Sequence, residues 1–116
     1  MRLDGPDCSN TRDVMGLRTS SGGRVRARTL IRSDRLDRLT PVGVAAVRAY
    51  GVSRIIDLRT ADEVRDVPGP FANDPIYRHA PFIDEQEDLR RDPVAESTPL
   101  ALYRGSVDRN GRCIGV

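Results

Sequence analysis

The sequence predicts an α/β fold, with an open sheet and flanking helices. Three observations lead to this: crude alternation of arginine and apolar residues over 25–32, a helical pattern from Thr40, and a short apolar run over 52–58. Strand and helix patterns that alternate along a chain are typical of sheets built from βαβ units. The 116 residues, 38% of them hydrophobic, have room for one modest domain.

The helix has clear start and stop signals. Thr40 is an N-cap residue, and Pro41 follows at the first helical position, where its missing N–H costs nothing. Apolar residues then recur at helical spacing as far as Tyr50, and Gly51 stands where a left-handed residue would end the helix. These signals predict a helix from Pro41 to about Tyr50.

The run over 52–58 predicts the next strand. Its centre, Ile55-Ile56, is apolar on both faces, which is typical of a buried parallel strand. Thr60 and Glu63 have the spacing of a capping box, so a short helix is expected directly after Arg59. In open α/β sheets the chemistry lies at the carboxyl ends of the strands.

The remaining elements have weaker signals. Residues 76–83 predict a strand that ends near Pro81, and the acidic residues 84–96 predict a surface loop or a mobile helix. Residues 100–116 have helical apolar spacing, interrupted by glycines that lower helix propensity. Because no capping signal precedes Val116, we expect a truncated chain.

Composition argues against several classes of partner and cofactor. All 19 basic residues are arginine, spread among 17 acidic residues for a net charge of +2, and aromatic residues make up only 4%, so we expect no nucleic-acid partner. No apolar run approaches the length of a membrane span, and no secretory signal opens the chain, so we expect a cytoplasmic protein. With only Cys8, Cys113 and His79 as soft ligands, we expect no metal site and no cofactor.

Short motifs follow one another along most of the chain in a fixed order. They are Asn10-Thr11-Arg12-Asp13, Leu30-Ile31-Arg32-Ser33-Asp34, Gly51-Val52, Ile56-Asp57-Leu58-Arg59, Glu63-Val64 and His79-Ala80-Pro81-Phe82. This order resembles the N-terminal part of the bacterial tyrosine-phosphatase family that includes a secreted mycobacterial lipid and protein phosphatase. The resemblance implies an incomplete tyrosine-phosphatase-like open sheet, with residues 1–116 forming the N-terminal portion of a single domain.

The same resemblance implies a phosphoric monoester hydrolase that works through a cysteinyl-phosphate intermediate. Such enzymes need a loop of the form C-x5-R, in which the arginine and backbone N–H groups hold the phosphoryl oxygens. Six residues after Cys8 stands Val14, and the same step from Cys113 passes beyond Val116, so residues 1–116 hold no such loop. We therefore expect this chain to be inactive alone, while its family would act on a phosphorylated protein or a phosphoinositide.

Three residues are candidates for the site. Asp84 follows a predicted strand in the way the family's general acid does; the alternative, a solvated loop aspartate beside other acidic residues, is favoured by the sequence around it. Asp57 and Arg59 end a predicted strand and are candidates for substrate binding; alternatively, Arg59 pairs with Asp34 or Asp57 and braces the strand end. His79 is expected to be a packed or hydrogen-bonded residue.

Two other functions stay open at this point. The stretch from Ile55 to Val64 is similar to a strand-and-helix motif of rhodaneses, which also need a downstream cysteine. The chain could also be a non-catalytic α/β binding module. An unpaired sheet edge would then favour self-association or docking to another chain.

Overall fold

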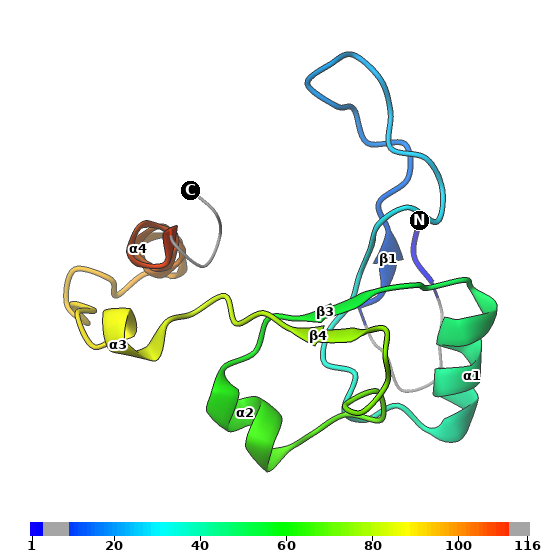
Figure 1. Ribbon diagram of the computed structural model, residues 1–116. Coiled ribbons are helices and arrows are strands. Elements are labelled where there is room, and N and C mark those ends of the chain that lie inside the picture. Colours follow the sequence, from blue (N-terminus) through cyan, green and yellow to red (C-terminus); the bar gives the residue numbers. More distant parts are fainter. Residues whose placement is uncertain (4–9, 112–116) are drawn as a thin grey trace. The chain divides into compact units, whose positions relative to one another are not determined.

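The computed structural model describes residues 1–3 and 10–111 (Figure 1). The contacts within the chain group it into two compact units. Unit 1 comprises Met1–Arg54 and Pro68–Ile76, and unit 2 comprises Ile55–Val67 and Tyr77–Val116. Helices are mixed with two small sheets of two strands each. The predicted α/β class is therefore confirmed.

The sheet of unit 1 pairs β1 (Arg12–Asp13) with β2 (Ile31–Arg32) in antiparallel register. The strand predicted over 25–32 is wrong except for its last two residues. Arg28 adopts a φ of 60°, in the left-handed region that strands do not use. Its backbone N–H donates to a carboxylate oxygen of Asp13 at 2.7 Å, so a turn replaces the strand at this point.

Helix α1 (Pro41–Ala49) has the ends that the sequence predicts. The Thr40 side chain accepts a hydrogen bond from the Gly43 backbone N–H at 3.4 Å, and Gly51 has a φ of 90°. Toward the end of the helix, the Arg48 guanidinium lies 5.4 Å from the ring centre of Phe71, which is 2% exposed and forms part of the core. The local capping signals were sufficient to place this helix.

The sheet of unit 2 pairs β3 (Ile55–Asp57) with β4 (Tyr77–His79) in parallel, as Figure 1 shows. The prediction of a parallel strand is confirmed, but burial on both faces is wrong. Ile55 is 8% exposed, whereas Ile56 is 61% and Leu58 57% exposed. Successive side chains alternate between the faces of a strand, and only the face that carries Ile55 is covered.

The described part of unit 2 also holds three helices, α2 (Ala61–Asp66), α3 (Glu85–Asp88) and α4 (Pro99–Arg109). The capping box of Thr60 and Glu63 at the start of α2 is confirmed. The helix predicted from residue 100 is confirmed as far as Arg109, and Cys8 and Cys113 lie outside the described residues.

Gly105 in α4 has a packing reason. The carboxylate of Glu96 and the guanidinium of Arg109 form an ion pair in the space that a Cβ atom at position 105 would occupy. The glycine that weakens the helical signal in the sequence therefore admits a charged pair against the helix backbone.

In the part of the chain that the structure describes, no helix combines the length and the apolar character that crossing a membrane requires.

Candidate functional site

The candidate site lies at the carboxyl ends of the two parallel strands of unit 2. The register places Asp57 opposite His79 and Ile55 opposite Tyr77. Paired residues of neighbouring strands project to the same face, so Asp57, Tyr77 and His79 share the face on which Ile55 is buried. This edge of a parallel sheet is where α/β proteins hold their ligands.

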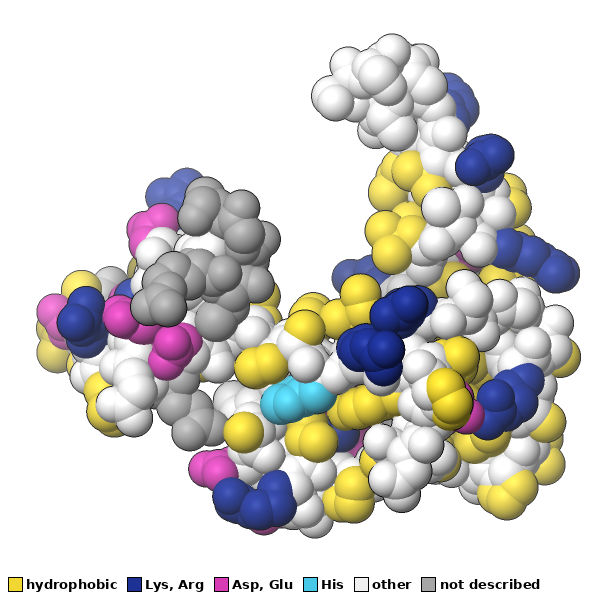
Figure 2. All heavy atoms as spheres, viewed as in Figure 1, with side chains coloured by type: hydrophobic (Ala, Val, Ile, Leu, Met, Phe, Trp, Pro, Cys, Tyr) yellow, Lys and Arg dark blue, Asp and Glu magenta, His cyan; other side chains and the backbone are white. Residues whose placement is uncertain are grey.

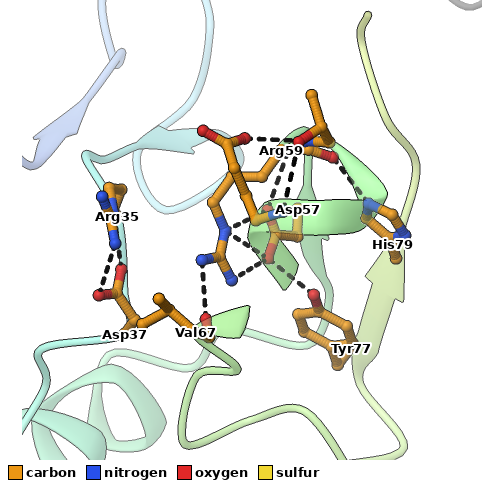
Figure 3. A network of polar contacts seen from close by, with 9 residues as sticks. Arg35, Asp37, Asp57, Arg59, Val67, Tyr77 and His79 are labelled. Carbon is orange, nitrogen blue, oxygen red and sulfur yellow. Dashed lines mark hydrogen bonds and ion pairs between the residues drawn. The ribbon is translucent and has the colours of Figure 1, made fainter. Parts of the chain in front are cut away.

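Asp57 and Arg59 form an ion pair at the end of β3 (Figure 3). Nη2 of Arg59 lies 2.9 Å from Oδ2 of Asp57, and Nε lies 3.1 Å from both carboxylate oxygens. The Arg59 backbone N–H also donates to Oδ1, at 3.1 Å. Both side chains are largely buried, with exposed fractions of 12% for Asp57 and 14% for Arg59. Forked contacts of this kind are among the strongest hydrogen bonds in proteins.

Arg59 also connects the strand end to the end of α2. Its Nη1 donates to the carbonyl oxygen of Val67, the C-cap residue of that helix, at 2.9 Å. The capping box holds the other end of α2, because Thr60 follows Arg59 directly. The guanidinium of Arg59 thus ties the last turn of this six-residue helix to β3, while the capping box closes the first turn directly after the strand.

Tyr77 completes the shell around the carboxylate. Its hydroxyl donates to Oδ2 of Asp57 at 2.7 Å (Figure 3). Burial by itself raises the pKa of Asp57, but the hydrogen bonds from Arg59 and Tyr77 outweigh it and lower that pKa to about 2. Burial and the same hydrogen bond raise the pKa of Tyr77. Asp57 is therefore an ionised acceptor at neutral pH and has no proton to donate.

His79 is held by a backbone contact. Its Nε2 lies 2.7 Å from the carbonyl oxygen of Arg59, and the side chain is exposed, as Figure 2 shows in cyan. A carbonyl oxygen can only accept, so Nε2 must carry the proton, which leaves Nδ1 as the acceptor of the neutral ring. The prediction of a hydrogen-bonded histidine is confirmed.

Asp84 lies in a second group of contacts in unit 2. Its Oδ1 accepts from the backbone N–H groups of Gln86 at 2.9 Å and Glu87 at 3.4 Å, so it caps the short helix α3. Its own N–H donates to Oδ1 of Asn110, which is 1% exposed and holds the end of α4 through the Ser106 carbonyl. Among the described residues, Oδ2 of Asp84 has no hydrogen-bond partner.

The structure thus joins two of the three predicted site residues, Asp57 and Arg59, and shows Asp84 in separate contacts. Sequence reasoning missed Tyr77 and Asn110. The strand register could have indicated Tyr77, because it lies two residues before His79 on the same face. Asn110 had no local signal, because its partners are 26 and 4 residues away.

No group of three histidine, cysteine, aspartate or glutamate side chains within residues 1–3 and 10–111 could hold a metal ion.

Comparison with known proteins gives one result that spans both units. The model of the family described as "Tyrosine phosphatase family" matches residues 3–114. No curated protein matches the chain. The match covers nearly the whole sequence, including both candidate groups at Asp57 and Asp84. The chain therefore belongs to the tyrosine phosphatase family.

Proposed function

We propose that this chain is the N-terminal portion of a single phosphatase domain, of the bacterial branch, and that it does not hydrolyse phosphate esters alone. The observation that carries this is the family match over residues 3–114, together with the lack of any C-x5-R sequence within residues 1–116. The nucleophile loop would then come from a segment outside these residues. The substrates of the whole enzyme would be phosphorylated proteins or phosphoinositides.

In the proposed reaction, a cysteine thiolate outside this chain attacks phosphorus and forms an S–P bond as the P–O bond to the leaving group breaks. Asp84 supplies the proton that the leaving oxygen takes up. Water then attacks phosphorus and returns a proton to Asp84 as the S–P bond breaks, which releases inorganic phosphate and the thiolate. Support for Asp84 comes from its Oδ2, which has no partner in the described residues, and from Asn110, which fixes the backbone beside it.

Asp57 and Arg59 would serve this reaction by supporting the substrate-binding loop. Arg59 already binds Asp57 and the Val67 carbonyl, so direct capture of a phosphate would compete with a nearly buried ion pair. We infer that the pair braces the strand end on which a phosphate loop would rest.

The first test is an assay of residues 1–116 with 4-nitrophenyl phosphate. We expect no turnover above that of buffer. Turnover that disappears in Cys113→Ser but survives in Cys8→Ser would contradict the proposal, because the nucleophile would then lie within this chain.

The second test is the coding DNA beyond codon 116, read in all frames. A stretch encoding H-C-x5-R close downstream is expected if a phosphatase domain continues there. With that segment joined in frame, Asp84→Asn should lower kcat at least about tenfold, while Asp92→Asn, another aspartate that caps a turn, should not.

A non-catalytic docking module is the second candidate, and the exposed apolar pair Ile56 and Leu58 favours it. Self-association through this face predicts that the molar mass in solution rises with protein concentration. Ile56→Lys would then restore the monomer, and a monomeric wild type at all concentrations would contradict this candidate.

A further inference from the structure

Three arginines lie side by side across the small sheet of unit 1. The register pairs Arg12 with Arg32, and an isolated bridge pairs Arg2 with Arg12. Directly paired residues project to the same face, and neighbouring strands lie about 4.8 Å apart, so the three Cβ atoms form a row about 10 Å long. We call Arg2, Arg12 and Arg32 the arginine row.

The row forms the solvent face of this sheet. All three of its residues are exposed, whereas Asp13, next to Arg12 along β1, is 1% exposed and points to the other face. The hydroxyl groups of Thr11 and Ser33 also bond to each other across the strands, at 2.8 Å, in positions that alternate with the row. Alternation along both strands therefore places the arginines on the face opposite to Asp13, Thr11 and Ser33.

Arg12 and Arg32 have no acidic partner among the described residues. The contact that Arg32 makes is a long one, 3.5 Å from Nη2 to the side-chain oxygen of Asn10. Elsewhere in unit 1, Arg35 pairs with Asp37, and Arg48 pairs with Asp74. Like charges directly opposite each other on a sheet destabilise it, so the pairing of Arg12 with Arg32 carries a cost that an anionic ligand would remove.

We propose that the arginine row binds an anion that carries two or more phosphate groups. A guanidinium presents a planar fork of donors that matches phosphate oxygens, and adjacent forks suit adjacent phosphates better than a single one. Such an anion could be a soluble polyphosphorylated compound or the phosphate headgroups of a lipid surface. The proposal is independent of catalysis, because it concerns unit 1 alone.

The test measures binding of sodium tripolyphosphate to residues 1–116 by calorimetry at low ionic strength, where screening is weak. Arg12→Gln combined with Arg32→Gln should weaken binding at least about tenfold. The matched control combines Arg26→Gln with Arg38→Gln, which removes the same charge from exposed positions of unit 1 and should change affinity about twofold or less. No measurable binding to the wild type, or equal loss in both double variants, would overturn the proposal.

Two further ligands test how many phosphate groups the anion must carry and whether it is a soluble compound or a lipid surface. Orthophosphate should bind at least about tenfold more weakly than tripolyphosphate, and equal affinity would overturn the multiple-phosphate requirement. Vesicles of phosphatidylcholine with and without phosphatidic acid distinguish the sources. Row-dependent pelleting with the acidic vesicles assigns a lipid surface, and row-dependent binding of tripolyphosphate alone assigns a soluble ligand.

The thermal stability of the double variant shows whether the arginine row serves to bind a ligand or to stabilise the sheet. Without ligand, the thermal midpoint of the glutamine double variant should stay the same or rise, because repulsion between opposed charges is removed. A fall of several degrees would show that the arginines stabilise the sheet and would contradict the proposal. Arg12→Lys with Arg32→Lys keeps the charge but loses the forks, and should retain the fold with weaker tripolyphosphate binding.

Discussion

Each unit contains a carboxylate that accepts a hydrogen bond from a tyrosine. In unit 1, the Tyr50 hydroxyl donates to Oδ2 of Asp13 at 2.8 Å, and in unit 2, the Tyr77 hydroxyl donates to Oδ2 of Asp57 at 2.7 Å. The pKa of both carboxyl groups is lowered, and that of both tyrosines is raised. The two centres nevertheless hold their negative charge in different ways.

The two carboxylates differ in the hydrogen-bond donors that they have besides the tyrosine. Asp13 accepts from the backbone N–H groups of Arg28 at 2.7 Å and Met15 at 2.9 Å, while the Arg28 guanidinium lies over the Tyr50 ring, 4.8 Å from its centre. Asp57 instead accepts from the guanidinium of Arg59. The first carboxylate fixes two turns of the backbone, and the second neutralises a nearly buried cation. A backbone clamp fits a structural role, whereas a charged pair at a strand end fits the support of an anion site.

Asp57→Asn should have the largest effect on stability. The variant keeps the shape of the side chain but removes the negative charge that faces the guanidinium of Arg59, which is 14% exposed. We expect a loss of about 2–3 kcal/mol in the free energy of unfolding, measured by urea denaturation. Asp57→Asn with Arg59→Met should recover part of that loss, and no recovery would contradict the ion-pair interpretation.

Asp13→Asn should lower the thermal midpoint less than Asp57→Asn does. The amide oxygen can still accept from the Arg28 or Met15 N–H, and no buried cation loses its partner. Hydrogen exchange should report faster exchange at these two amides without faster exchange in β3. An effect larger than that of Asp57→Asn would reverse the comparison.

The features that could be predicted from sequence are the local ones. Thr40, Gly51 and the Thr60–Glu63 capping box act within one turn of helix, so their residue types alone define the geometry. The turn at Arg28 could not be predicted, because its left-handed backbone depends on an acceptor 15 residues away.

In the candidate site, too, the contacts between residues near in sequence could be predicted, and those between distant residues could not. The contact between Asp57 and Arg59 spans two residues and could be foreseen as one of two alternatives for Arg59. The contact of Tyr77 with Asp57 spans 20 residues and depends on strand register. The exposure of Ile56 depends on which elements cover the sheet, which the apolar run itself does not encode.

Acidification should weaken the protein at both centres. The pKa of Asp57 is about 2 in the folded state against 3.8 ordinarily, so below pH 4 the unfolded chain binds more protons than the folded one. Its contribution is complete above about pH 4 and disappears as the pH falls toward 2; allowing for solvent screening, it amounts to about 1–2 kcal/mol. Urea midpoints from pH 5 to pH 2 should therefore fall less steeply in Asp57→Asn than in the wild type. Equal slopes would contradict the assignment.

The smallest expected effects come from the two tyrosines, and they separate the centres most finely. Tyr77→Phe removes one neutral hydrogen bond, so stability should fall by about 1 kcal/mol or less, and the pKa of Asp57 should rise while Arg59 keeps it below its ordinary value. Tyr50→Phe keeps the ring under the Arg28 guanidinium, and the backbone N–H groups, Arg28 first, still lower the pKa of Asp13. Carboxyl carbon shifts followed by NMR against pH would measure both values. Added salt should then raise the pKa of Asp57 more than that of Asp13, because Asp57 accepts directly from a guanidinium, whereas the N-terminal ammonium is the smallest of the causes that lower the pKa of Asp13. Equal salt responses would show that the two carboxylates are held in the same way.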